Sequence, residues 1–276
     1  MSSILTNQGA MVALQTMKSI NRDMGTVQNQ ISTGLKVGSA KDNSAIWAIG
    51  KTMSSDADAM RTVQSSISVG QSTVAVARSA TESVVDLLGE MKSLMLQAGE
   101  NVDNEKIQEN LEELQNQIVT ILDSASFNGL NLLNEAGDGL RTTSALVRDG
   151  STLETEQISV AAVDMKTAIE ALAFDADTNL GSPAAIDTTL GAIETQLQAF
   201  IDKAAELGVT EKRMEIQSNF VGSLIDGLRA GVGAMVDADM EEASARLQAL
   251  QVQQQLGIQA LSIANQQPQN ILSLFR

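Results

Sequence analysis

The residue types that most often carry enzyme chemistry are missing from this chain of 276 residues, which contains no His and no Cys. Their absence removes the commonest general base, the commonest transition-metal ligand and the usual thiol nucleophile. Carboxylates remain, and adjacent acids such as Glu112 and Glu113 are in principle suited to acid–base catalysis. An apolar stripe on the opposite side of the same expected helix favours a solvated acidic face instead. We therefore expect no catalytic residues and a protein that is not an enzyme.

Two acidic runs resemble the beginning of a calcium-binding loop. Residues 175–179 offer the first three oxygen ligands of an EF-hand, but Ile186 stands where a bidentate Glu is needed. Residues 237–241 fail in a similar way, because Glu242 occupies the position of the turn glycine. Solvated acidic turns explain both runs better than a metal site does, so we expect no bound metal.

The segment Gly231-Val232-Gly233 begins like a loop that binds dinucleotide phosphates. The third glycine of that motif would fall at a position that Val236 occupies, and no strand pattern precedes the segment. We interpret these glycines as helix-packing residues. The sequence therefore predicts no cofactor.

The net charge of −16 argues against nucleic acid or an anionic membrane as a partner, because both attract clustered Lys and Arg. The first 50 residues carry +2 and residues 245–276 carry +2, whereas residues 51–244 carry −20. This distribution predicts chain ends that are buried and a middle that faces water. No basic segment followed by an apolar run begins the chain, and no apolar stretch approaches the ~20 residues that span a bilayer. We expect neither a cleaved signal nor a membrane anchor.

Apolar residues near both ends of the chain recur at alternating spacings of three and four, which is typical of coiled-coil helices. The N-terminal stripe consists of Ala10, Ala13, Met17, Ile20, Met24, Val27 and Ile31. The C-terminal stripe consists of Val236, Met240, Ala243, Leu247, Leu250, Gln254, Gly257, Leu261 and Ala264. A second row on the C-terminal helix consists of Ala249, Val252, Leu256, Ala260 and Ile263. The apolar surface of that helix is therefore wider than one partner helix would cover.

The middle of the chain is predicted to form long helices around a small β region. An apolar stripe over residues 60–98 predicts a rod of about 60 Å at ~1.5 Å per residue. Further helices are expected over residues 104–125 and 183–235, the last opened by a proline. Residues 142–160 predict a β-hairpin, because an Asp-Gly turn separates two β-prone runs. The expected fold is mainly α: a long-helix coiled-coil rod with a small β-hairpin region and paired N- and C-terminal helices.

Five segments resemble the signatures of bacterial flagellins, and they occur in the order found in that family. The segments are "ILTNQGAMVAL" (4–14), "QISTGLKVGSAKDNSAIWAI" (30–49), "SFNGLNLL" (126–133), "LGVTEKRMEIQSNF" (207–220) and "ANQQPQNILSLFR" (264–276). The resemblance covers residues 1–160 and 185–276. The large variable outer domains of many flagellins look absent, because only a short segment separates the two flagellin-like parts.

This resemblance implies a structural subunit of the bacterial flagellar filament, which self-assembles into a helical tube used for swimming motility. It implies an inner coiled-coil domain of residues 1–45 plus 236–276 and an outer helical rod domain of residues 46–235 with the β-hairpin. The implied partners are other copies of the chain or paralogous flagellins, a flagellar export chaperone, the type III export apparatus, and filament cap and junction proteins. The implied location is the extracellular flagellum, after secretion.

Other classes of protein share some of these features. A hook–filament junction protein is the nearest alternative, because it belongs to the same flagellar class. A helical signalling rod like that of a chemoreceptor is also acidic and rich in Gln and Ala, but the β-hairpin and the lack of a membrane span count against it. An enzyme on a helical scaffold is disfavoured by the missing His and Cys.

The stripes and the tail "QNILSLFR" (269–276) predict the residues of subunit packing, in which the two stripes are buried against each other either directly or in a neighbouring copy. These residues are Met17, Ile20, Met24, Val27, Ile31, Leu247, Leu250, Leu261, Ile271, Leu272, Leu274 and Phe275. Burial of the four apolar tail residues would contribute about 6–12 kcal/mol, whereas ordering the tail costs ~1–2 kcal/mol per residue in backbone entropy. Because these terms nearly cancel, we expect a tail that is disordered in the free subunit and ordered by assembly.

The resemblance also implies a receptor-contact region at Gly89, Glu90 and Leu94. In many flagellins a basic stretch on the long outer helix contacts Toll-like receptor 5, and the corresponding segment here is "LLGEMKSLMLQ" (87–97). An acidic residue in place of a basic one reverses the electrostatic complementarity. We therefore expect weak or absent activation of that receptor.

Overall fold

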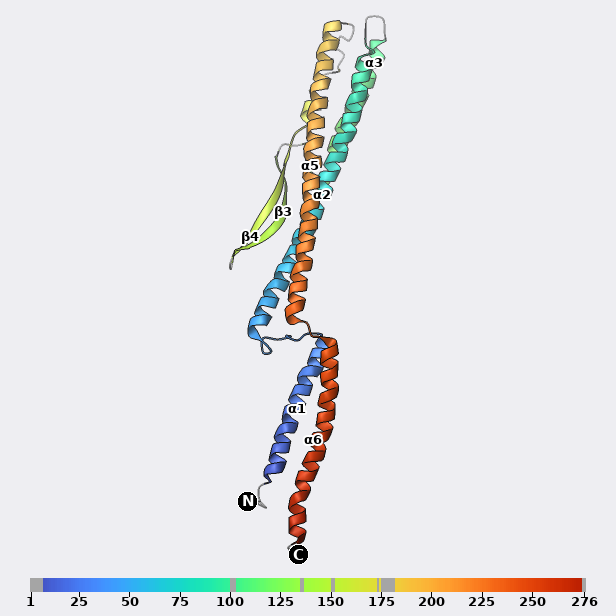
Figure 1. Ribbon diagram of the computed structural model, residues 1–276. Coiled ribbons are helices and arrows are strands. Elements are labelled where there is room, and N and C mark those ends of the chain that lie inside the picture. The colour runs from blue at the N-terminus through green and yellow to red at the C-terminus, as the bar shows by residue number, and fades with distance from the viewer. Residues whose placement is uncertain are drawn as a thin grey trace. The chain divides into compact units, whose positions relative to one another are not determined.

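The computed structural model describes residues 7–99, 103–134, 137–149, 152–172, 174 and 182–274, with the backbone alone at 138 and from 267 onward. Its helices are α1 (Gln8–Thr33), α2 (Ser44–Met95), α3 (Asn104–Ser124), α4 (Lys166–Glu170), α5 (Pro183–Val236) and α6 (Met240–Leu274) (Figure 1). Its strands are β1 (Ser126–Phe127), β2 (Leu130–Asn131), β3 (Gly137–Asp149) and β4 (Thr152–Ala162). The predicted mainly α fold is confirmed.

The chain divides into two compact units. The terminal unit combines Met1–Ala57 with Gly227–Arg276, and the central unit is Asp58–Asp226. Because α2 and α5 each cross a unit boundary, both helices contribute to both units. Over the ranges that the structure describes, no helix is both long enough and apolar enough to cross a bilayer.

In the terminal unit, α1 and α6 lie side by side and run antiparallel (Figure 1). Gln254 Nε2 donates to Asn21 Oδ1 at 2.8 Å, and Leu35, just past α1, bridges to Asp237, just before α6. The predicted pairing of the N- and C-terminal helices is therefore confirmed. The core between them consists of Ile20, Val27, Ala243 and Leu250, with Met24, Ile31 and Leu247 packed against it.

Both ends of α1 are capped by local hydrogen bonds. Asn7 is the N-cap, and its Oδ1 accepts from Ala10 N at 3.0 Å. Gly34 ends the helix with φ 72°, and its N–H donates to Gln30 O at 2.8 Å. A left-handed residue at this position is most easily supplied by glycine, because glycine has no Cβ to clash.

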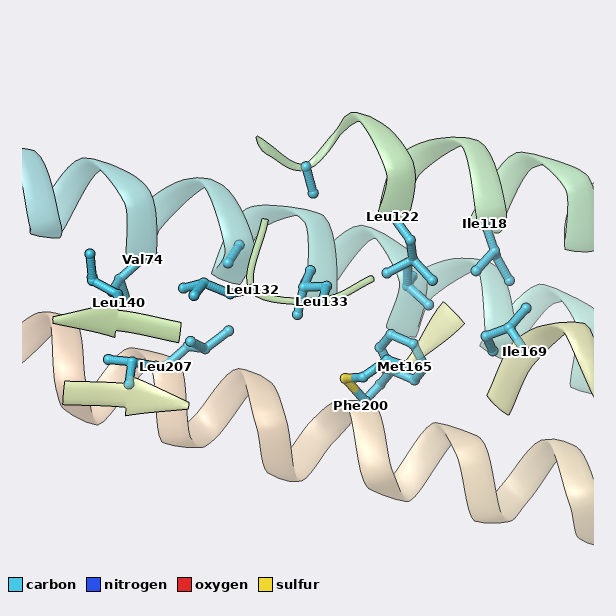
Figure 2. Close-up of a cluster of buried hydrophobic side chains, with 14 of the residues drawn as sticks. Val74, Ile118, Leu122, Leu132, Leu133, Leu140, Met165, Ile169, Phe200 and Leu207 are labelled. Atoms are coloured by element: carbon cyan, nitrogen blue, oxygen red, sulfur yellow. The ribbon is translucent and has the colours of Figure 1, made fainter. Parts of the chain in front are cut away.

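The core of the central unit lies between the apolar stripes of α2, α3 and α5. Its fully buried side chains include Ile67, Val74, Leu88, Met91 and Met95 of α2, Leu111, Ile118 and Leu122 of α3, and Ile193, Phe200, Leu207 and Met214 of α5. All but Leu122 are positions of the predicted stripes, which placed the neighbouring Ile121 inward instead. In addition, α2 begins well before residue 60. Figure 2 shows Leu133, which follows β2, and Met165, which precedes α4, in the same cluster as Phe200.

β3 and β4 form an antiparallel hairpin, which confirms the predicted one. Leu140 lies opposite Val160 and Thr142 lies opposite Ile158, and all four side chains are buried. The residues from 152 to 157 at the far end of the hairpin are exposed. The hairpin is thus anchored by the half that lies away from its turn.

The hairpin approaches α2 closely at one glycine. A Cβ on Gly70 would lie 2.4 Å from Thr142 Oγ1, so the strand can pack here only because α2 carries no side chain at this position. β3 also contacts α5, because Gln217 Nε2 donates to Ser144 O at 2.9 Å. Both contacts hold β3 against the helices.

Two small elements were not predicted from the sequence. The β1–β2 hairpin turns at Asn128 and Gly129, which have φ 52° and 81°. The helix α4 is held by Gln115, whose Nε2 donates to Ile169 O at 2.7 Å and to Leu172 O at 2.8 Å. A five-residue helix and two-residue strands are too short to produce an apolar period.

Candidate assembly interface

A continuous apolar row on α6 remains uncovered in the chain. Val252, Leu256 and Ile263, which sequence analysis placed in a second row, are 56%, 57% and 65% exposed. Ala249 and Ala260 of the same row are exposed as well. Soluble monomers rarely leave apolar side chains in such contiguous patches. The prediction that α6 has more apolar surface than α1 can cover is therefore confirmed.

α1 also exposes apolar side chains, which sequence analysis missed. Met11, Val12 and Leu14 are 65%, 64% and 44% exposed. They lie beside the predicted stripe, in the first two turns of the helix. Their hydrophobicity was visible in the sequence, but spacing alone did not separate them from the stripe that faces α6. Both α1 and α6 thus have uncovered apolar surface.

The predicted packing residues fall into two groups. Ile20, Val27 and Leu250 are buried between α1 and α6 of the same chain, and Met24, Ile31 and Leu247 pack against them. Met17 and Leu261 are half-buried on the same two helices. The structure brings this first group together inside one chain.

The second group of predicted packing residues lies in the tail. The backbone is helical through Leu274, which differs from the disordered tail expected for the free subunit. The side chains of Ile271, Leu272 and Leu274 and the whole of Phe275 lie outside the described residues. Their contacts with neighbouring copies stay a prediction.

The central unit has its own uncovered apolar row, which sequence analysis also missed. Val209, Ile216 and Phe220 of α5 are 71%, 60% and 58% exposed. Their spacings of seven and four place them on one face of the helix. This face lies opposite the buried stripe that contains Met214, so the long helix is apolar on two sides.

The implied receptor-contact region lies on α2. Gly89 and Glu90 are exposed, and Leu94 is half-buried. The region therefore presents one acidic side chain, that of Glu90, to solvent. Its role in receptor contact stays a prediction.

A small cavity of about 160 Å³ lies in the terminal unit beside the single tryptophan. Leu35, Val37, Trp47, Val232 and Val236 are among its lining residues. Pockets for cofactors usually hold about 300–1,000 Å³, so this cavity does not resemble a cofactor site.

The glycines that opened a dinucleotide-like motif lie inside α5 and serve helix packing. A Cβ on Gly231 would lie 3.0 Å from Met53 Cε, and a Cβ on Gly50 would lie 2.9 Å from Val236 Cγ2. The close approach of α2 and α5 in the terminal unit therefore depends on glycines. No strand precedes Gly231, because the preceding residues are helical.

One acidic run serves as a helix cap. Asp239 Oδ1 accepts from Glu241 N at 2.9 Å and from Glu242 N at 3.2 Å, and so caps α6. The other run, residues 175–179, lies outside the described residues. In the part of the chain that the structure describes, no three acidic side chains gather as metal ligands would.

Charge is divided very unevenly between the two units. Asp58–Asp226 holds ten Lys and Arg against 27 Asp and Glu, whereas the terminal unit holds eight against seven. The central unit therefore carries −17 and the terminal unit +1. A unit with almost no net charge and with uncovered apolar rows is suited to close packing between copies, because little net charge repels.

The loop between α1 and α2 is ordered by a carboxylate that titrates below its usual range. Asp42 Oδ2 accepts from the Ser39 hydroxyl and from Ser39 N, each at 2.9 Å, and these bonds lower the pKa of Asp42 below 3.8. Because the folded pKa is lowered, the stabilisation is present above the ordinary pKa and is lost as the pH falls through the lowered value.

We expect Asp42→Asn to reduce stability slightly at neutral pH and to have less effect in acid. The test is urea unfolding of the parent chain and the variant, followed by the loss of helicity, at pH 7 and at about pH 2. The urea midpoints of the two proteins are compared at each pH. The difference between the proteins should shrink at the lower pH. Asp23→Asn, an exposed change on α1 away from the loop, is the control. A difference that grows in acid would contradict the role of the Ser39 bonds.

A mainly helical chain that leaves apolar rows uncovered on both of its units has the surface expected of a subunit in a larger assembly. Comparison with known proteins identifies the assembly. Residues 4–138 match the bacterial flagellin N-terminal helical region, and residues 190–275 match the bacterial flagellin C-terminal helical region. The chain belongs to the bacterial flagellin family and is a structural subunit of the flagellar filament, which lies outside the cell.

Relatives match along the whole chain. Flagellin FljM of Caulobacter vibrioides is 42% identical over 100% of this chain and 99% of its own length. A flagellin of Brucella melitensis is 39% identical over 100% of both chains. A putative flagellar hook-associated protein from Vibrio parahaemolyticus has a TM-score of 0.55 at 16% identity, covering 71% of this chain and all of that one. That likeness shows a shared fold alone, and the comparisons do not favour the junction-protein or signalling-rod alternatives.

Proposed function

We propose that copies of this chain pack together through the uncovered apolar rows of α1 and α6, which form the inner layer of the filament. The observation that carries this proposal is the exposure of Val252, Leu256 and Ile263 on a helix whose other apolar side is already buried. Residues 1–45 and 236–276 make up the inner coiled-coil domain in this proposal. Residues 46–235 make up the outer rod.

The charge of the two units supports this assignment. Copies arranged around an axis are most crowded near it, so the inner layer favours surfaces that carry little net charge. The terminal unit carries +1, whereas the central unit carries −17 and is better placed where water and salt can screen it. The row of Val209, Ile216 and Phe220 on α5 then supplies contacts between neighbouring outer rods.

The proposed route to the filament is export by the flagellar type III apparatus. The exposed apolar rows of α6 must be shielded from water before assembly. An export chaperone that binds the C-terminal segment would shield them. Paralogous flagellins and the filament cap and junction proteins are the other proposed partners. All of these partners are expected to contact the same terminal helices.

A test of the interface is to place a charge on the exposed row while leaving the α1–α6 pair intact. We expect Leu256→Asp to abolish polymerisation on filament seeds, because a carboxylate would be desolvated at every repeated contact. The helicity of the free subunit should stay unchanged, since Leu256 is 57% exposed there. Gln255→Asp, an exposed change beside it, is the matched control for added charge. Normal filaments from Leu256→Asp protein would contradict the proposed interface.

A further inference from the structure

α6 contains a proline in its interior. Pro268 lies between Met240 and Leu274, and the backbone is helical on both sides of it. Proline has no amide hydrogen, so it cannot make the usual bond to the carbonyl four residues earlier. That carbonyl belongs to Ala264. A carbonyl left without a donor costs free energy unless another group satisfies it.

The donor that satisfies it comes from the other end of the chain. Asn7 Nδ2 donates to Ala264 O at 2.7 Å. The same side chain accepts from Ala10 N through Oδ1 at 3.0 Å, while the backbone oxygen of Asn7 accepts from Met11 N at 3.1 Å. One amide thus caps α1 with its oxygen and completes α6 with its nitrogen. An Asp at this position would cap equally well but would lack the donor.

The two helices approach closely beside this bond. A Cβ on Gly9 would lie 3.8 Å from Ala264 Cβ and 3.5 Å from Asn7 Oδ1. These are ordinary contact distances. Because residue 9 is glycine and residue 264 is alanine, the two helices lie close enough here for the Asn7 amide to reach the backbone of α6.

The apolar stripes of α1 and α6 do not define their own alignment. They repeat at spacings of three and four, so sliding one helix by a heptad again sets apolar residues against apolar residues. The carbonyl of Ala264, unlike the repeating stripes, marks one position along α6. Pro268 is the single proline of that helix, so it leaves this one carbonyl without its usual helical donor. A single polar contact within an apolar seam is a known way to specify register in coiled coils.

We infer that Asn7 is a positioning residue that fixes the register of α1 against α6 at the end of the pair remote from the Leu35–Asp237 bridge, by bonding to the carbonyl that Pro268 leaves free. In the proposed assembly, a fixed register keeps the exposed apolar side chains of α1 and α6 at constant positions relative to each other for the neighbouring copy. That last step rests on the proposed function, whereas the register itself does not. The two are therefore tested by separate measurements.

The register can be measured by a cross-link, because the chain has no Cys of its own. Gly9→Cys with Ala264→Cys places two Cβ atoms about 3.8 Å apart, which suits a disulfide. The full chain with this pair is equilibrated in glutathione buffers, and the effective concentration of one thiol at the other is recorded. The measurement is repeated with Asn7→Asp, with Pro268→Ala and with both changes.

We expect Asn7→Asp to lower the effective concentration about five- to tenfold when Pro268 is present, because it leaves the Ala264 carbonyl without a donor. With Pro268→Ala, the amide of residue 268 satisfies that carbonyl, so Asn7→Asp should then change the value less than about twofold. Equal effects of Asn7→Asp in both backgrounds would show that Asn7 acts only as a helix cap and would overturn the inference. So would failure of the parent pair to cross-link.

A control variant separates this bond from other polar contacts of the pair. Asn21→Asp keeps the oxygen that accepts from Gln254 Nε2 and should act equally in both backgrounds. If the effect of Asn21→Asp on the effective concentration depended on Pro268 as strongly as the effect of Asn7→Asp does, the inference would be overturned. Polymerisation on seeds is then compared for four proteins that lack the added cysteines: the parent chain, Asn7→Asp, Pro268→Ala and the variant with both changes. If cross-linking follows the expected pattern but polymerisation does not, the register role stands and the proposed assembly surface is wrong.

Discussion

Leu250→Asp should prevent stable filaments from forming, and it should do so by a different route from a change on the exposed row. Leu250 is buried between α1 and α6 of the same chain. An Asp there loses the apolar burial and places a carboxylate among the apolar side chains of Ile20, Val27 and Ala243, at a cost of about 3–5 kcal/mol. The pair itself, and not only its contact with neighbours, should therefore be weakened.

The distinction is measurable in the free subunit. Circular dichroism during urea unfolding should show an earlier transition for Leu250→Asp than for the parent chain, and micrographs after seeding should show no filaments. Gln248→Asp adds the same charge at an exposed position of α6 and should leave the unfolding transition close to that of the parent. Filaments of normal length and acid resistance from the Leu250→Asp chain would mean that the assigned stripe is wrong.

Gly70→Ala should destabilise the central unit although alanine is the better helix former. The added Cβ would lie 2.4 Å from Thr142 Oγ1, so β3 would have to move away from α2. Overpacking of this kind typically costs about 1–3 kcal/mol. The thermal unfolding midpoint measures the loss.

A matched pair of variants makes this result specific. Gly89→Ala lies on the same helix with nothing within 4 Å of its new Cβ, and should stabilise by about 0.5–1 kcal/mol through helix propensity alone. Thr142→Ala removes the nearest atom and should recover most of the loss in the Gly70→Ala background. If Gly70→Ala and Gly89→Ala raised the midpoint equally, the close contact between α2 and β3 would be excluded.

The long helices were predictable because each repeats its apolar period over many turns. The stripe of α2 and the first turn of α5 at Pro183 were correct, and the start of α3 fell at Asn104 as expected. The hairpin was predictable because an Asp-Gly pair marks a turn between β-prone runs. Short elements such as α4 depend on distant side chains, here Gln115, and leave no period to detect.

The candidate interface was only partly predictable, for a physical reason. A helix with two apolar faces does not reveal which face its own chain will cover, so the sequence left open whether Leu250 packs against α1 of the same chain or of a neighbouring copy. The structure places Leu250 against α1 of the same chain. The rows on α1 and α5 became visible only when exposure was known. The bond between Asn7 and Ala264 joins residues 257 positions apart, and no local pattern announces it.

The cavity beside Trp47 has an optical consequence. The chain has one Trp and no Tyr, so its near-ultraviolet fluorescence comes almost entirely from a single indole. That indole is half-buried where the segment after α1 meets the ends of α2 and α5 that belong to the terminal unit. Its emission wavelength therefore reports the wetting of one known position, and each filament carries such a probe once per subunit. Loosening of this junction can be followed as a red shift, without any added dye.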